Sequence, residues 1–280
     1  MAKVLMFHRV LPKKLITEPN AYSTFGTLIS QEYFEEILKH LIDNKFEFVS
    51  ISEIDERTNN RKQVALTFDD GYSDNFEFAL PILQKFNLTA TFYPILNPCI
   101  NNAVLPLDRY YQCVDEMTLS DEKREDYISG DIKKKFYWSK PEEQEKFLKT
   151  TFTELQSNRV SYLQPSQIRY LADNGFEIGS HSVTHSLFTA EYMDESQIIF
   201  ELQHSKNSLE LITAKPVNSF CFPSGYYNES GINLARENGY TSVCIIKKKK
   251  DIKSESLPTY ERIFVKPNSL EELSIALNDL

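Results

Sequence analysis

The sequence has few cysteines, and none of them form a pattern typical of a redox or zinc site. Only four occur among 280 residues, at positions 99, 113, 221 and 244, and no two of them make a Cys-x-x-Cys pair. Cys221 and Cys244 lie in apolar runs, where free thiols pack as small hydrophobic side chains. We therefore expect all four thiols to be reduced.

The sequence also lacks a hydrophobic run of membrane-spanning length. The apolar run near the N-terminus, residues 4–7, has only four residues, which is too short for the hydrophobic region of a signal peptide. These absences predict a cytoplasmic protein with no transmembrane segment, although a shortened chain would give the same pattern.

Positive charge is in deficit, with 31 Lys and Arg against 40 Asp and Glu, a net charge of −9. A general nucleic-acid binder is attracted first to phosphates, and no basic stripe is present, so we expect no nucleic-acid partner. One run of four lysines spans residues 247–250. It favours a solvated turn, with weak contact to anionic lipid or nucleotide phosphates as the alternative. The sequence does not indicate an oligomeric state.

What the chain does have is an alternation of helical and extended patterns, with 41% hydrophobic residues. Residues 31–44 and 194–213 place apolar side chains at helical spacing. Apolar runs typical of strands lie between such segments, including residues 46–51, 64–68, 88–95 and 241–246. This alternation is typical of parallel βαβ units. Counting strands gives seven or eight, so we expect an α/β fold: a distorted (β/α) barrel with about seven parallel strands.

The alternation lapses between about residues 97 and 165. This segment is polar, aromatic and charged, contains the only tryptophan, Trp138, and predicts helices near residues 119–127 and 140–155. We therefore expect one domain over residues 1–280 with an insertion at about 97–165. The insertion is either a solvated helical appendage or a cap that shapes a substrate pocket.

Two adjacent carboxylates, Asp69 and Asp70, end the strand-like run Val64 to Phe68 and precede Gly71. Like charges this close raise one another's pKa. A metal ion against one carboxylate would let the other stay ionised as a base.

His181 and His185 follow a second strand-like run, and their spacing would put them on one face of a helical turn. With Asp70 they make a two-histidine, one-carboxylate set. Asp-Asp-Gly turns are common in proteins without a metal site, and so are histidine pairs on helix surfaces. Together, at predicted strand ends of a barrel, they favour a metal site. His8 also follows a strand-like run.

Several motifs resemble, in order, the NodB-homology polysaccharide deacetylases, carbohydrate esterase family 4. Thr67 to Gly71 (TFDDG), His181 to His185 (HSVTH) and Phe220 to Asn228 (FCFPSGYYN) are similar to the first three motifs of that family. Conventional members have a late motif that ends in a histidine, whereas no histidine follows His204 here. Val4 to Val10 (VLMFHRV) resembles instead a circularly arranged subgroup that includes biofilm exopolysaccharide deacetylases.

The resemblance implies a distorted barrel and a divalent ion on Asp70, His181 and His185. Zinc is the expected ion, and the same ligands also serve cobalt, nickel or iron. The resemblance gives Asp69 the role of base. It also implies that Tyr226, or a backbone N–H near it, helps to hold the oxyanion.

Two roles depend on departures from the family pattern. His8 is our candidate for the acid that protonates the departing amine, because the first and last strands of a closed barrel are neighbours.

Many members have an arginine in the third motif that orients the base, where this chain has Cys221 and Phe222. Arg262 is the candidate replacement, with a surface salt bridge as its alternative role.

The expected function is metal-dependent removal of an N-acetyl group from an amino sugar. Without an export signal, a nucleotide- or lipid-linked precursor of surface polysaccharide is the expected substrate. Deformylation, or hydrolysis of another amide or imide, is an alternative within enzymes. A non-catalytic carbohydrate-binding relative is the alternative from another class, and the presence of Asp69, Asp70, His181, His185 and His8 argues against it.

Overall fold

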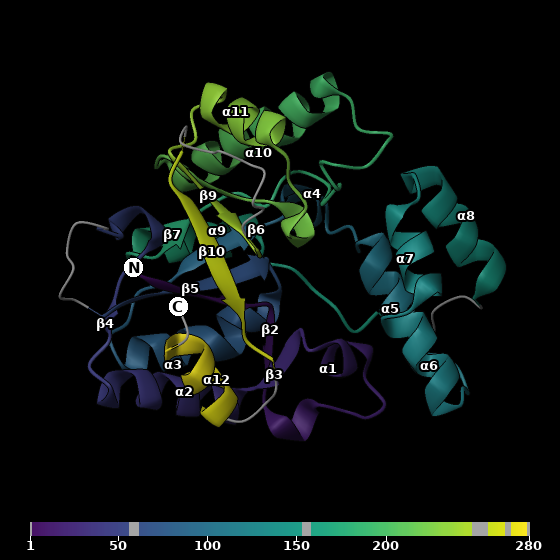
Figure 1. Ribbon diagram of the computed structural model, residues 1–280, viewed down its shortest axis with the longest axis horizontal. Helices are drawn as coiled ribbons and strands as arrows, with labels where there is room; N and C mark the ends of the chain where they lie inside the picture. The colour runs from purple at the N-terminus through teal and green to yellow at the C-terminus, as the bar shows by residue number, and fades with distance from the viewer. Residues whose placement is uncertain (1, 56–61, 153–157, 248–256, 267–269, 279–280) are drawn as a thin grey trace.

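The computed structural model describes residues 2–55, 62–152, 158–247, 257–266 and 270–278. In Figure 1 the strands lie at the centre, helices lie above and below them, and a separate group of helices lies to the right. Among the described residues, no helix is both long and apolar enough to cross a bilayer. Residues 248–250, which belong to the lysine run considered for lipid contact, lie outside the described part of the chain.

Seven parallel strands form a nearly closed barrel, which confirms the predicted fold class. They are β1 (Lys3–Phe7), β5 (Gln63–Asp70), β6 (Thr91–Pro94), β7 (Glu177–Ile178), β8 (Ser219–Cys221), β9 (Ser242–Ile245) and β10 (Thr259–Phe264). Their order is β7-β6-β5-β1-β10-β9-β8, and every neighbouring pair is parallel. An isolated parallel bridge between Ser180 and Phe220 joins the chain just after β7 to β8 and so brings the two ends of the sheet together.

The strand β1 lies between β5 and β10, and this position brings the two ends of the chain to one site. Phe7 pairs in register with Phe68, and Met6 pairs with Phe264. His8 and Asp69 therefore leave the barrel at the same level, at the carboxyl ends of neighbouring strands. Such strand ends are where active sites of (β/α) barrels form.

Helices cover the outside of the barrel (Figure 1). They are α2 (Gln31–Asp43), α3 (Leu80–Lys85), α9 (Pro165–Asp173), α10 (Glu195–Thr213), α11 (Glu229–Glu237) and α12 (Leu270–Asn278). The predicted amphipathic helix over 31–44 is confirmed, since α2 buries Phe34, Ile37, Leu38 and Leu41. Inside this layer Phe68 stacks between Phe7 and Phe92, with ring centroids 5.4 and 4.9 Å apart. These aromatic contacts between neighbouring strands hold the centre of the sheet together.

Several short elements differ from the sequence pattern. The predicted strand over 46–51 is only β4 (Glu47–Phe48), paired with β5 and followed by the 3₁₀ turn η2 (Ile51–Glu53). Residues 88–95 contain the shorter β6.

Between β1 and α2 the chain forms further small elements: β2 (Arg9–Leu11), η1 (Lys13–Leu15), α1 (Ala21–Phe25) and β3 (Leu28–Ser30), with β2 paired to β3. After β5 comes a π-helical turn, η3 (Asn75–Ala79). Short elements depend on tertiary contacts more than on local pattern.

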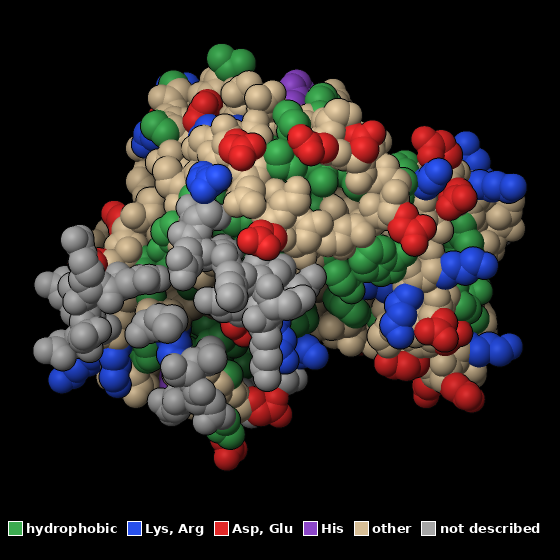
Figure 2. All heavy atoms as spheres, turned by 45° about the horizontal axis from the view of Figure 1, so that its top comes forward, with side chains coloured by type: hydrophobic (Ala, Val, Ile, Leu, Met, Phe, Trp, Pro, Cys, Tyr) green, Lys and Arg blue, Asp and Glu red, His purple; other side chains and the backbone are tan. Residues whose placement is uncertain are grey.

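Residues 97–165 contain more helix than the sequence pattern predicts. The helices are α4 (Leu96–Asn101), α5 (Pro106–Glu116), α6 (Asp121–Ile128), α7 (Asp131–Trp138) and α8 (Pro141–Thr151). Figure 1 shows α5 to α8 as one group beside the barrel. Tyr110 stacks on Phe136 at 4.5 Å and meets Phe152 edge-on at 5.4 Å, so this group has an aromatic core of its own. Figure 2 shows charged side chains of both signs over this group and hydrophobic side chains where it meets the barrel.

Asp108 of α5 connects the helical group to the barrel. Its carboxylate accepts hydrogen bonds from the hydroxyls of Tyr22 (2.7 Å), Tyr72 (2.9 Å) and Tyr162. Tyr72 lies two residues after Asp70, so this contact joins the helical group to the turn that follows β5. Burial raises the pKa of Asp108 to about 6 despite the three donors. A buried carboxylate is tolerated here because hydroxyl donors satisfy its oxygens.

Replacing Asp108 tests this connection. Asp108→Ala should lower the free energy of unfolding by about 3 kcal/mol, because it leaves three buried hydroxyls without their acceptor. Urea denaturation measures the change. Asp43→Ala, at an exposed position of α2, is the control and should stay within about 0.5 kcal/mol of the parent. Equal stability of the two variants would contradict the role of Asp108.

Candidate metal centre and catalytic site

The backbone at the end of β5 turns Asp70 out of the sheet. Asp70 has φ +69°, in the left-handed region that a non-glycine residue seldom adopts, and Gly71 has φ +74°. A Cβ at position 71 would lie 2.9 Å from the Cα of Pro94, so only glycine fits there. The strained turn therefore holds the two neighbouring carboxylates in different directions.

The prediction of a helical turn for His181 to His185 is wrong: the segment is an irregular loop. Ser182 and His185 have φ of +71° and +65°, which interrupts any helix. Glu201 of α10 holds the loop, because its carboxylate accepts from the N–H groups of Val183 (2.7 Å) and Thr184 (3.0 Å) and from the Thr184 hydroxyl (2.6 Å). The sequence analysis missed Glu201. The sequence feature that could have indicated Glu201 is a glutamate about one turn from the apolar positions of a helix that packs on the barrel.

The loop brings both histidines to Asp70. The Nε2 atoms of His181 and His185 lie 3.4 and 3.5 Å from Asp70 Oδ1. That oxygen is buried without a hydrogen-bond partner. His181 Nδ1 lies 2.8 Å from the carbonyl oxygen of Cys221, which can only accept, so Nδ1 carries the proton and the Nε2 lone pair faces Asp70. An unpartnered carboxylate oxygen between two imidazole nitrogens fits a divalent cation.

The charges of this set also suit a cation. Burial alone would raise the pKa of Asp70, but the histidines around it lower that pKa well below its usual range. Burial lowers the pKa of His185 to about 4, so the ring is neutral at neutral pH, as a ligand must be. Burial also lowers the pKa of His181, but the negative charges of Asp69 and Asp70 outweigh the effect of burial, so the pKa of His181 is raised.

A second set of potential ligands, Asp69 with His181 and Cys221, lies equally close together. It suits a cation less well. Burial raises the pKa of the Cys221 thiol well above its usual value, whereas a cysteine binds metal as the thiolate. Asp69 already has a cationic partner. The first set, with Asp70, is therefore the better candidate metal centre.

Asp69 pairs with Arg262 of β10 inside the barrel. Arg262 Nη1 lies 2.7 Å from Asp69 Oδ1 and 3.3 Å from the Thr67 hydroxyl, and the arginine is only 4% exposed. The structure therefore has this guanidinium against the carboxylate and not in a surface salt bridge. Burial would raise the pKa of Asp69, but Arg262 and His181 lower it, so the carboxyl group is ionised at neutral pH.

His8 extends from the end of β1 towards the same site. Its ring meets Phe264 edge-on at 5.5 Å, and its Nδ1 atom is buried without a partner. The backbone around it is fixed from the other side of the turn: the His8 carbonyl accepts from Asn75 (2.7 Å), and Arg9 forms a buried 2.9 Å ion pair with Asp74. The position of His8 is thus tied to the segment that follows Asp69 and Asp70.

These side chains line one cavity of about 250 Å³. Its polar lining is His8, Asp69, Asp70, Asp108, Lys133, Lys134, His181, His185, Ser224 and Arg262, and its aromatic lining is Tyr22, Phe25, Tyr72, Tyr111, Tyr137, Trp138, Tyr226 and Phe264. The structure therefore brings together every catalytic and metal-binding candidate of the sequence analysis. Their roles stay predictions. The unpartnered polar atoms of His8 and Asp70 converge in this cavity, which is what a binding site for a polar ligand requires.

A comparison with known families decides the family. The sequence model of the family described as polysaccharide deacetylase matches residues 56–243. The chain belongs to the polysaccharide deacetylase family. The predicted family is thereby confirmed.

Known members and solved structures agree with this assignment. YxkH of Bacillus subtilis (strain 168), a protein with a polysaccharide deacetylase name, is 21% identical over 242 residues. The match covers 85% of this chain and 61% of YxkH. The fold resembles the deacetylase PplD of Streptococcus pyogenes (TM-score 0.67, 19% identity, 99% and 98% of the two chains) and IcaB of Ammonifex degensii (TM-score 0.64, 17% identity, 99% and 96%).

Tyr226 of this member of the polysaccharide deacetylase family is expected to help to hold the oxyanion, through its side chain or a backbone N–H near it. Its N–H donates to the Pro223 carbonyl at 3.1 Å, within the turn η4 (Pro223–Gly225). Its own backbone amide is therefore engaged, and the expected role of the side chain or of a neighbouring N–H stays a prediction. The ring lines the cavity and meets Trp138 edge-on at 4.7 Å.

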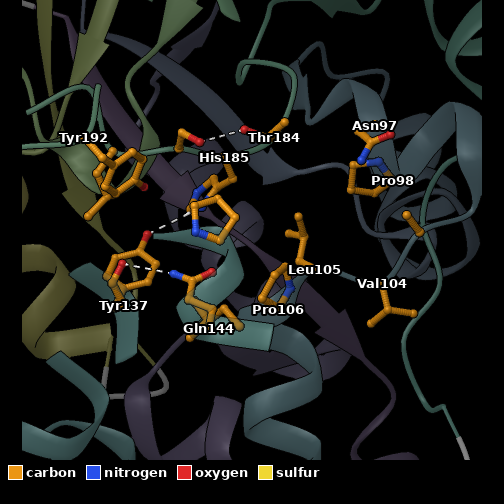
Figure 3. Close-up of a pocket in the computed structure, with 15 residues that line it drawn as sticks. Asn97, Pro98, Val104, Leu105, Pro106, Tyr137, Gln144, Thr184, His185 and Tyr192 are labelled. Carbon is orange, nitrogen blue, oxygen red and sulfur yellow. Dashed lines mark hydrogen bonds between the residues drawn. The ribbon is translucent and has the colours of Figure 1, made fainter. Parts of the chain in front are cut away.

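Tyr137 of α7 is a neighbour of the metal centre that the sequence analysis missed. Its hydroxyl lies 3.4 Å from His185 Nδ1 and also hydrogen-bonds the Ser224 hydroxyl. Figure 3 shows Tyr137 and His185 facing one another in a second cavity, of about 250 Å³. If His185 Nδ1–H donates to Tyr137 and Tyr137 donates to Ser224, then the Nε2 lone pair of His185 is left free for a cation beside Asp70. Such partners orient metal-binding histidines. No local pattern indicates this contact across 48 residues.

Removing the Tyr137 hydroxyl tests this orientation. Tyr137→Phe should weaken binding of a divalent ion about 10- to 100-fold, because His185 loses the partner that fixes its ring. Competition with a chromophoric chelator measures the affinity for zinc in the absence of turnover. Tyr170→Phe, on the outer face of α9, is the matched control and should leave the affinity unchanged. Equal affinities for both variants would exclude a role of Tyr137 in orienting His185.

Proposed function

We propose that this member of the polysaccharide deacetylase family is a metal-dependent hydrolase that removes an N-acetyl group from an amino sugar. The observation that supports this most directly is the unpartnered Oδ1 of Asp70 between two imidazoles, in the same cavity as the Asp69–Arg262 pair. Asp70, His181 and His185 would hold one divalent ion, with zinc favoured and cobalt, nickel or iron compatible. Such an ion, when bound, polarises an amide carbonyl and lowers the pKa of water.

Asp69 acts as the general base in this proposal. Arg262 binds Oδ1, which leaves Oδ2, 4.0 Å from His181 Nε2, to accept the proton of the attacking water. The lowered pKa keeps the carboxylate ionised and ready to accept. Arg262 is a positioning residue: it holds the carboxylate in one orientation and stabilises its charge.

His8 acts as the general acid. Cleavage of the C–N bond leaves an amine whose nitrogen needs a proton, and His8 lines the cavity with an imidazole Nδ1 that has no hydrogen-bond partner. Burial lowers the pKa of His8. A lower pKa makes the protonated imidazole a stronger acid towards the amine, although a smaller fraction is protonated at neutral pH.

The substrate is an N-acetylated sugar joined to a nucleotide or lipid carrier. A cavity of about 250 Å³ lies at the small end of ligand pockets, which favours recognition of a single sugar and its linkage over a long stretch of polymer. The rings of Trp138 and Tyr226 offer apolar faces to the sugar.

Acetate release tests the function. The zinc-loaded protein should release acetate from N-acetylglucosamine oligomers or from a nucleotide-linked N-acetyl sugar, and chelation should abolish the release. Asp70→Ala should lose both metal and activity, whereas Asp173→Ala, on the surface of α9, should keep both. Release of formate from N-formyl sugars without acetate release would support the deformylase alternative. Sugar binding without release of any acid would support a non-catalytic relative.

Asp69→Asn separates the base from the metal site. The variant should keep its metal, because Asp70 and the histidines are untouched, and should lose about 10²- to 10⁴-fold in kcat. Metal content and steady-state rates are measured on the same preparation. A kcat close to that of the parent would remove Asp69 from the role of base.

His8→Ala tests the acid through the leaving group. The variant should keep metal and fold, lose about 10²- to 10⁴-fold in activity on an N-acetyl sugar, and lose much less on an activated ester such as 4-nitrophenyl acetate. The ester needs no protonation to depart. His40→Ala, in α2 outside the cavity, is the control. Loss of metal, or equal losses on both substrates, would contradict the assignment.

A further inference from the structure

We propose that Lys133 of α7 is the residue through which the cavity recognises an anionic group on its substrate, either a phosphoryl group in the linkage or a carboxylate on a neighbouring sugar. This inference rests on the proposed function, because it concerns the substrate of the same site. It adds a binding determinant from the α5 to α8 helical group, outside the motifs quoted in the sequence analysis.

The setting of Lys133 differs from that of an ordinary surface lysine. Its Nζ lies 4.4 Å from the ring centroid of Phe25 and 4.7 Å from that of Tyr137, and the side chain lines the catalytic cavity. Lys134 also lines the cavity, but its Nζ is 3.4 Å from Asp131. Within the described part of the chain, no carboxylate forms an ion pair with Lys133. A half-buried ammonium between two rings, without an anion, is available for an anionic ligand.

The other charged groups of this cavity lie next to polar or charged side chains. Asp69 has Arg262 at 2.7 Å, and Asp108 accepts three tyrosine hydroxyls. Asp70 faces two imidazoles. An anionic group that enters the cavity therefore meets Lys133 as an uncompensated positive charge. In a protein with a net charge of −9, such a charge is needed to offset the general repulsion of an anionic substrate.

The place of Lys133 suits a group beside the scissile amide. Tyr137, whose ring lies under the ammonium, also contacts His185 through its hydroxyl. The metal centre and the Lys133 subsite therefore share one wall of the cavity. Burial, with a smaller effect of Lys134, lowers the pKa of Lys133 to about 8, which leaves it mostly protonated at neutral pH. A bound anion would favour the charged form further.

A purely structural role is the competing explanation, since the contact of Lys133 with Phe25 also joins α7 to α1. The two explanations differ in what a neutral replacement does. A structural contact affects stability and all substrates alike. A recognition residue affects only those substrates that carry the anion.

The experiment compares three N-acetyl substrates: a neutral N-acetylglucosamine oligomer, UDP-N-acetylglucosamine, and an oligosaccharide in which a uronic acid adjoins the N-acetyl sugar. Lys133→Met should lower kcat/KM about 10- to 100-fold for whichever anionic substrate the site prefers. It should leave the neutral oligomer within about twofold. Lys133→Arg should restore most of the loss, and Lys135→Met, at an exposed position of α7 that does not line the cavity, should have no selective effect. The anionic substrate that responds identifies phosphoryl or carboxylate as the ligand.

Failure of this inference is distinguishable from failure of the proposed function. If the parent releases acetate and Lys133→Met lowers all three values of kcat/KM equally, or none, Lys133 does not recognise an anion, although the deacetylase function stands. If the parent releases no acetate from any substrate, the proposed function fails. Calorimetric binding of UDP and of glucuronate then decides the inference: about tenfold weaker binding of either anion to Lys133→Met than to Lys135→Met supports it, and equal binding of both anions overturns it.

Discussion

Two carboxylates that are neighbours in the chain, Asp69 and Asp70, are buried together at the end of β5, and the site depends on how the fold separates them. Buried like charges are tolerated only when each has a partner of opposite charge. Asp69 faces Arg262 inside the barrel, while the left-handed backbone at Asp70 turns that side chain towards His181 and His185. One carboxylate is thereby suited to accept a proton and the other to bind a cation.

The barrel order makes this separation feasible. Because β1 lies between β5 and β10, Arg262 on the last strand reaches Asp69, and His8 at the end of β1 reaches the same cavity. The guanidinium that stabilises Asp69 therefore comes from the far end of the chain. Cys221, which stands in the third motif where many relatives have arginine, has its sulfur 3.7 Å from Asp69 and leaves room for this arrangement.

Three interactions of different kinds join the helical group from α5 to α8 to the site. Asp108 accepts hydroxyl hydrogen bonds that join it to the turn after β5, Tyr137 contacts His185 of the candidate metal centre, and Lys133 presents a positive charge to the cavity. The family match shows the shared deacetylase domain. Differences between members in substrate are expected where segments that connect the strands line the cavity.

The sequence by itself determined the barrel and the residues that meet in its cavity. Alternating helical and strand periodicity predicts parallel βαβ units, and short motifs at strand ends identified Asp69, Asp70, His181, His185 and His8. Periodicity and motifs are local signals, so they report only on residues that are close together in the sequence. The loop conformation at His181 to His185, the pairing of Arg262 with Asp69, and the contacts of Glu201, Tyr137 and Lys133 were decided only by the tertiary structure. Each joins residues that are distant in sequence or adopts a backbone conformation that distant contacts support, and local patterns contain no record of such contacts.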